Sequence, residues 1–123
     1  MVVFYADDDL DDRELFADAL EEVNPQIKLI LASNGHEIIQ LLENHDTPDF
    51  IFLDINMPVM SGKECLKQLK RMERLKSVPI IMYTTTSNKE EFKNLVLLGA
   101  ADCVIKGVSF QAIKESLRNI LND

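Results

Sequence analysis

Five short, nearly continuous apolar runs recur along the chain, and they constrain its fold more than any other feature. The runs are VVFYA (2–6), IKLILA (27–32), FIFL (50–53), PIIMY (79–83) and CVI (103–105). Runs of this length without regular polar alternation are typical of β-strands that are covered on both faces, as in parallel sheets. The pattern therefore predicts five strands, most of them covered on both faces.

Segments with helical periodicity follow these runs. In each segment, apolar residues recur at positions that share one face of a helix. The stripes comprise Leu15, Phe16, Ala19, Leu20 and Val23; Ile38, Ile39, Leu41 and Leu42; Cys65, Leu66, Leu69 and Met72; Phe92, Leu95 and Val96; and Phe110, Ile113, Leu117 and Ile120. Ser61, Ser87 and Ser109 are expected to cap the N-termini of the last three helices.

Alternating strands and helices predict an α/β fold, in which a parallel sheet carries helices on both faces. Five strand–helix pairs suit the flavodoxin-like (βα)5 fold with strand order 2-1-3-4-5. The 123 residues suffice for one domain with a proper core, so we expect residues 1–123 to form a single domain. Ligands of such sheets bind beyond the carboxyl ends of the strands where the order reverses, here between the first and third strands.

The composition argues against several classes of protein. A net charge of −8 is unsuited to binding the phosphate backbone of nucleic acids. No run approaches the ~18 apolar residues that a membrane span needs, and the N-terminus MVVFYADDD lacks the features of a secretory signal. We therefore expect a cytoplasmic protein without nucleic-acid or membrane partners, in which Cys65 and Cys103 are reduced thiols.

Acidic residues follow the two strands that border the expected crevice. Asp7 and Asp8 follow the first strand, and Asp54 follows the third. Neighbouring carboxylates raise one another's pKa, so such a cluster needs a compensating cation. Mg²⁺ prefers oxygen ligands, whereas the lack of histidine and cysteine in the cluster argues against zinc. Asp54 could then be either a metal ligand or a nucleophile that forms an aspartyl-phosphate.

Two further strands end in residues that suit a phosphoryl group. Thr84 ends the fourth strand and offers a hydroxyl, and Lys106 follows the fifth strand and offers an ammonium group. Each residue alone has an ordinary structural explanation, since a lysine at a strand end often lies at the surface. Together with the acids at the carboxyl ends of the strands, they predict a site for phosphoryl chemistry.

The combination resembles the receiver domain of bacterial two-component response regulators over essentially the whole chain. The matching segments are the acid pair Asp7–Asp8, LDINMPVMSG around Asp54, PIIMYT ending in Thr84, GAAD before the fifth strand, and Lys106. The resemblance implies a single-domain phosphoacceptor signalling protein of a phosphorelay. Such a protein catalyses only its own phosphorylation and dephosphorylation and is not otherwise an enzyme.

The resemblance also implies roles for the acids and their neighbour Asn56. Asp54 would accept a phosphoryl group from a phosphohistidine of a sensor histidine kinase or a histidine phosphotransfer protein. The Asp8 and Asp54 carboxylates and the Asn56 backbone carbonyl would bind Mg²⁺, the only expected cofactor, and Asp7 would help, partly through water. Thr84 would close onto the phosphoryl group and Lys106 would pair with it, and the signal would pass by protein contact to an unidentified target.

Three positions depart from the pattern of the family. Thr85 follows the threonine where a smaller residue is common, Gly107 replaces the usual proline after the lysine, and Cys103 stands where an aromatic residue is usual. We expect a trans Lys106–Gly107 bond, because a cis bond before a residue other than proline costs about 2.5–4 kcal/mol. The altered fifth strand leaves an alternative open, a receiver-like adaptor that binds its partner independently of phosphorylation.

Overall fold

A parallel five-stranded sheet with strand order β2-β1-β3-β4-β5 forms the centre of the molecule. The computed structural model describes residues 1–121. Its strands are β1 (Val2–Ala6), β2 (Lys28–Ala32), β3 (Phe50–Leu53), β4 (Ile80–Thr84) and β5 (Asp102–Ile105). All four neighbouring pairs are parallel. The flavodoxin-like order predicted from the sequence is confirmed, with strand bounds that differ by at most one residue.

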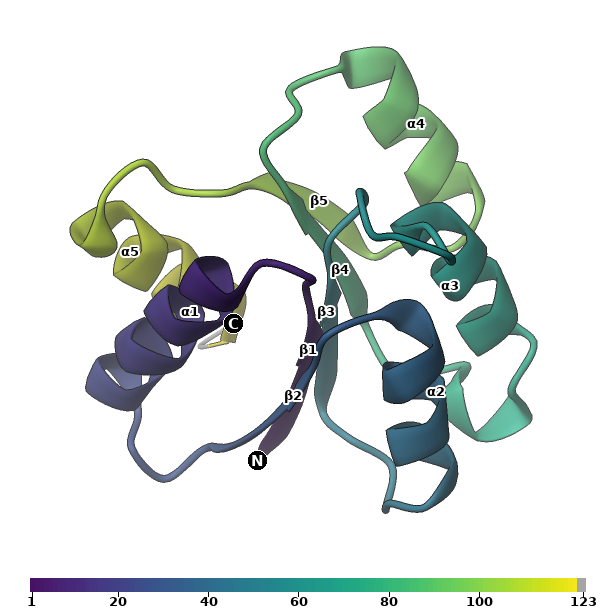
Figure 1. The fold of residues 1–123 in the computed structure, drawn as a ribbon, viewed down its shortest axis with the longest axis horizontal. Coiled ribbons are helices and arrows are strands. Elements are labelled where there is room, and N and C mark those ends of the chain that lie inside the picture. The colour runs from purple at the N-terminus through teal and green to yellow at the C-terminus, as the bar shows by residue number, and fades with distance from the viewer. Residues whose placement is uncertain (122–123) are drawn as a thin grey trace.

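Helices cover both faces of the sheet. They are α1 (Leu10–Val23), α2 (Gly35–Glu43), α3 (Gly62–Lys70), α4 (Lys89–Leu97) and α5 (Phe110–Leu121), with a short 3₁₀ helix, η1 (Glu73–Leu75), before β4. Figure 1 shows α1 and α5 on one face, and α2, α3 and α4 on the other. No helix of residues 1–121 is long and apolar enough to cross a membrane.

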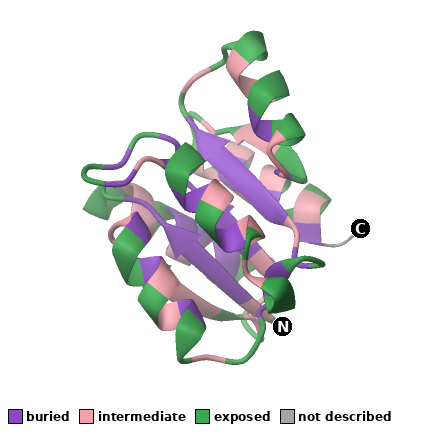
Figure 2. Cartoon of the chain, turned by 90° about the vertical axis from the view of Figure 1, so that its right-hand side faces the viewer, coloured by how far each residue is buried: buried purple, intermediate pink, exposed green. Residues whose placement is uncertain are grey.

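Each strand contributes alternate side chains to two separate cores. In β1, Phe4 packs in the core below α2 and α3, whereas Tyr5 packs in the core below α1 and α5. The second core is aromatic, because Tyr5 stacks on Phe16 with ring centroids 4.2 Å apart and Phe52 and Tyr83 pack edge-on against Phe16. Figure 2 shows these buried strands between helices whose outer surfaces are exposed. The sheet is thereby fixed from both sides.

Two of the three predicted helix caps are confirmed. The Ser61 hydroxyl accepts a hydrogen bond from the Glu64 N–H at 3.2 Å, and that of Ser109 accepts from the Ala112 N–H at 3.1 Å. The prediction for Ser87 is wrong. Helix α4 begins one residue later, and the Asn88 side chain caps it by accepting from the Glu91 N–H at 3.0 Å. Asparagine is at least as good an N-cap as serine, so the sequence alone did not distinguish Ser87 from Asn88 as the cap.

Most of the runs were expected to be covered on both faces, and β1, β3 and β4 are largely buried. Strands β2 and β5 are only partly buried. They lie at the two edges of the sheet, where helices cover less of each strand. Both cysteines are free thiols, as predicted; Cys65 is buried and Cys103 is half-buried.

Candidate functional site

The carboxyl ends of β1 and β3 bring three acidic residues together. Strand β1 pairs with β3 so that Ala6 lies opposite Leu53, and the Asp54 N–H donates to the Ala6 carbonyl at 3.0 Å. The residues that follow these strands are therefore neighbours. One carboxylate oxygen from each of Asp7, Asp8 and Asp54 lies within 4.8 Å of the other two. The acids meet at the predicted reversal of strand order.

The two acids after β1 have different environments. Asp7 is fully buried, and its carboxylate accepts hydrogen bonds from the Tyr5 hydroxyl, from the Asp9 N–H at 2.9 Å and from Lys106 Nζ at 2.6 Å. Asp8 is exposed. The protein itself therefore holds the Asp7 carboxylate in place, whereas the Asp8 carboxylate faces solvent and can accept a ligand.

The Asp54 carboxyl has an altered pKa. Burial and the neighbouring Asp7 charge raise its pKa to about 6, although Lys106 and a hydrogen bond from the Asn56 backbone oppose the rise. The site thus has more negative charge than its one ammonium group offsets. A hard divalent cation such as Mg²⁺ fits this donor set, because all the converging ligand atoms are oxygen. Asn56, the predicted fourth ligand, is exposed in the loop that follows Asp54.

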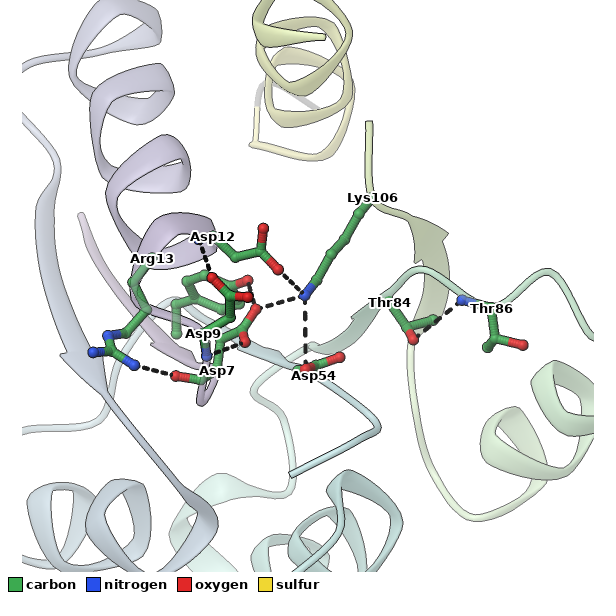
Figure 3. A network of polar contacts seen from close by, with 9 residues as sticks. Asp7, Asp9, Asp12, Arg13, Asp54, Thr84, Thr86 and Lys106 are labelled. Atoms are coloured by element: carbon green, nitrogen blue, oxygen red, sulfur yellow. Dashed lines mark hydrogen bonds and ion pairs between the residues drawn. The ribbon is translucent and has the colours of Figure 1, made fainter. Parts of the chain in front are cut away.

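Lys106 extends from the end of β5 into the acid cluster (Figure 3). Its Nζ lies 2.6 Å from Asp7 Oδ2, 2.8 Å from Asp12 Oδ2 and 3.6 Å from Asp54 Oδ2. Burial opposes the charged form, but the bonds to Asp12 and Asp7 and the charge of Asp54 outweigh it, so the pKa of Lys106 is raised. The ammonium group is therefore positively charged at neutral pH and ties β5 to the ends of β1 and β3.

Thr84 lies at the end of β4, fully buried. Figure 3 places it beside Asp54, on the side away from Asp7. Its Oγ1 accepts a long hydrogen bond of 3.4 Å from the Thr86 N–H. In this arrangement the hydroxyl binds its own loop, and that loop leads directly into α4.

Two glycines permit close approaches near the site. A Cβ at Gly62 would lie 2.1 Å from the Asp54 carbonyl oxygen, so only glycine lets α3 begin this close to the end of β3. A Cβ at Gly107 would lie 2.9 Å from the Ile113 backbone nitrogen. No cis peptide bond occurs in residues 1–121, so the predicted trans Lys106–Gly107 bond is confirmed. Glycine lets the loop after Lys106 pack against α5.

The loop after Asp54 contains an unusual backbone conformation. Val59 has a φ of 68°, and the Met60 N–H donates to the Pro58 carbonyl at 2.7 Å. A β-branched residue rarely adopts positive φ, because its Cβ approaches the backbone too closely. Strained residues of this kind often lie at functional sites. Here the strained residue lies five positions after Asp54.

Two residues of the site were missed from the sequence. Tyr5 precedes Asp7 by two positions, a spacing that places both side chains on one side of an extended chain. Asp12 lies in the first turn of α1, four residues after Asp8, where an acid is expected for its effect on the helix dipole alone. The two-residue spacing from Asp7 could have identified Tyr5 as a residue of the site. No local signal distinguishes Asp12 from the other acids of α1.

Comparisons with known proteins agree with this arrangement. The sequence pattern of the response regulator receiver domain family matches residues 3–118. The chemotaxis protein CheY1 of Helicobacter pylori is 27% identical over 121 residues, which cover 98% of this chain and 97% of that protein. A chemotaxis protein CheY homolog of Campylobacter jejuni is 31% identical over 90 residues, which cover 73% of this chain and 69% of the relative.

Solved structures show the same architecture. The chemotaxis response regulator CheY4 of Vibrio cholerae superposes with a TM-score of 0.84 at 25% identity, covering 97% of each chain. The Mn²⁺-bound form of response regulator Rcp1 has a TM-score of 0.87 at 24% identity, covering 98% of this chain and 94% of that one, and it supports the fold alone. Fold, family pattern and relatives agree, and the chain belongs to the response regulator receiver domain family.

Proposed function

We propose that residues 1–123 form one phosphoacceptor signalling domain, which takes a phosphoryl group from a phosphohistidine onto Asp54. The donor is a sensor histidine kinase or a histidine phosphotransfer protein. The observation that carries this proposal is the position of Asp54, which lies within 4.8 Å of two further carboxylates and has the Lys106 ammonium 3.6 Å away. The domain catalyses only its own phosphorylation and dephosphorylation.

The transfer moves a phosphoryl group between two side chains. An Asp54 oxygen forms a bond to phosphorus while the phosphorus–nitrogen bond of the donor breaks, and the electron pair of that bond stays on the imidazole. Asp8, Asp54 and the Asn56 carbonyl would hold Mg²⁺, with help from Asp7 partly through water, and the ion would supply positive charge near the phosphoryl oxygens. Phosphoryl transfer depends mainly on such positioning and charge neutralisation.

Lys106 and Thr84 respond to the new group. Lys106 Nζ, already within ion-pair distance of Asp54, neutralises part of the phosphoryl charge. The Thr84 hydroxyl, which accepts a long hydrogen bond from the Thr86 N–H, turns to donate its own proton to a phosphoryl oxygen. Because residues 85–88 join β4 to α4, this movement changes the position of that loop and of α4. The signal then passes to a target protein by contact.

Chemical phosphorylation tests the proposal without the natural partner. Acetyl phosphate with Mg²⁺ should add about 80 Da, the mass of one phosphoryl group, to the wild-type protein. Asp54→Asn should abolish the addition, whereas Asp46→Asn, which removes an exposed acid remote from the cleft, should leave it unchanged. Equal labelling of Asp54→Asn would refute the assignment.

The adaptor alternative predicts a different result. It rests on the three departures from the family pattern around the acid site, at Thr85, Cys103 and Gly107. An adaptor would bind its partner equally well as wild type and as Asp54→Asn. A phosphoacceptor domain should change its partner affinity after acetyl phosphate treatment only when Asp54 is present.

A further inference from the structure

Asp12 is not one of the residues assigned to phosphoryl chemistry, yet its carboxylate makes one of the two short bonds of Lys106. Asp12 Oδ2 lies 2.8 Å from Nζ, whereas Asp54 Oδ2 lies 3.6 Å away, beyond hydrogen-bond distance. A lysine ammonium has three donors. Two of them point to Asp7 and Asp12. In this state Lys106 is therefore bonded to Asp7, which follows β1, and to Asp12 of α1, and not to the proposed acceptor.

The position of the Asp12 carboxylate is fixed by the start of α1. The Asp9 side chain caps the helix by accepting from the Asp12 N–H at 3.0 Å, which sets the first turn. The Lys106 side chain is only 10% exposed and that of Asp12 is 33% exposed, so solvent screens this pair incompletely. The contact is part of the folded structure and not a chance encounter of two flexible surface chains.

The Asp12 and Asp54 carboxylates lie on different sides of the Lys106 ammonium, as Figure 3 shows. A phosphoryl group bound to Asp54 would attract Nζ toward Asp54 and away from Asp12. Asp7, which lies between the two, can keep its bond during this movement. The negative charge of Asp12 therefore stabilises the position of Lys106 before phosphorylation relative to its position afterwards.

We propose that Asp12 is a positioning residue that competes with the phosphoryl group for Lys106 and so slows phosphorylation of Asp54. The proposal rests on the function proposed above for Asp54 and Lys106. It assigns Asp12 a regulatory role at the same site, since its negative charge opposes the attraction of Lys106 toward a phosphoryl group on Asp54. The opposite role, in which Asp12 holds Lys106 ready for the phosphoryl group, predicts the opposite effect of removing it.

A kinetic experiment separates the two roles. Asp12→Asn removes the competing charge and keeps the size of the side chain. Asp11→Asn is the matched control, because Asp11 also lies in the first turn of α1 but is exposed and forms no bond to Lys106. With acetyl phosphate and Mg²⁺, we expect Asp12→Asn to be phosphorylated roughly three- to fivefold faster than wild type, as suits a partly exposed charge pair. Asp11→Asn should stay close to wild type.

A second measurement uses neither metal nor phosphodonor. The ¹⁵N signal of the Lys106 ammonium should shift in Asp12→Asn and remain in place in Asp11→Asn, because Asp12 accepts a hydrogen bond from that group and Asp11 does not. An unchanged signal in Asp12→Asn would overturn the proposal, as would a phosphorylation rate equal to that of Asp11→Asn or slower than wild type. A wild-type protein that takes up no phosphoryl group would refute the proposed function as well. A labelled wild type with no rate difference would refute only the role of Asp12.

Discussion

The acid cleft and the edge formed by α4 and β5 are built in opposite ways. In the cleft, Asp7 and Thr84 are fully buried, and their polar atoms are hydrogen-bonded. Helix α4 has a single buried residue, Leu95, and the side chain of Leu97 is 77% exposed. A groove of about 330 Å³ separates α4 from β5, lined by Phe92, Lys93, Val96, Leu97, Asp102 and Cys103. The cleft is held by buried hydrogen bonds, whereas α4 has a single buried side chain.

The small side chain of Cys103 accounts for part of this difference. Its Sγ lies 3.8 Å from the Phe92 carbonyl oxygen and fills little of the space between the helix and the strand. The loop of residues 85–88 joins the hydrogen-bonded cleft to this helix with its single buried side chain. A protein can respond to a ligand only where two arrangements differ little in free energy. We therefore expect chemistry in the cleft and movement at α4.

The largest expected effect comes from breaking the attachment of α4. Leu95→Ala should lower the free energy of unfolding by about 2–5 kcal/mol, because it empties the only buried position of the helix. Urea denaturation measures the change. Leu97→Ala is the control and should alter stability by less than about 0.5 kcal/mol. Equal losses in both variants would show that α4 is packed more evenly than its burial indicates.

Mg²⁺ bound in the cleft should change the stability of the protein by a smaller amount. At about 100 times its dissociation constant, a ligand that binds only the folded state adds roughly 2.7 kcal/mol of stability. Thermal denaturation should show this stabilisation in wild type and in Leu97→Ala, but not in Asp8→Ala, which lacks the exposed carboxylate. A large drop in the metal-free melting temperature of Asp8→Ala would instead indicate a structural role for Asp8.

The raised pKa of Asp54 predicts a pH-dependent effect on the metal-free protein. Burial and the Asp7 charge raise this pKa from 3.8 to about 6, so the folded state binds the proton more tightly than the unfolded chain. The group has no effect below the unfolded pKa, destabilises progressively as pH rises through the folded pKa, and exerts its full cost above it. Asp54→Asn should therefore raise the melting temperature at about pH 8 and change it little at about pH 4. A gain independent of pH would contradict this account.

The smallest expected effect concerns Cys103. We predict that a beryllium fluoride mimic of the phosphoryl group changes amide NMR shifts mainly in residues 84–98, and that Cys103→Ala responds in the same way. The thiol makes few contacts that could differ between two states. Loss of the α4 response in Cys103→Ala would show that the thiol takes part in passing the change at Asp54 to α4.

Much of the fold and of the site could be predicted because the relevant signals are local. Apolar runs and helical stripes identify strands and helices within a few residues of chain, and alternation of the two implies a parallel sheet. In such a sheet the carboxyl ends of all strands point to the same end of the molecule. Residues that directly follow strands, such as Asp7, Asp54 and Lys106, are therefore brought together whatever the details of packing.

Only the tertiary structure shows the contacts that depend on how the helices are placed on the sheet. The bond between Asp12 and Lys106 joins residues 94 positions apart, and it exists because α1 is turned so that one of its acids faces the end of β5. Likewise, the exposure of β2 and β5 follows from their edge positions and not from their apolar sequences. The sequence by itself determined which groups end the strands, because that is a property of short segments. Packing between distant segments determined which of those groups touch.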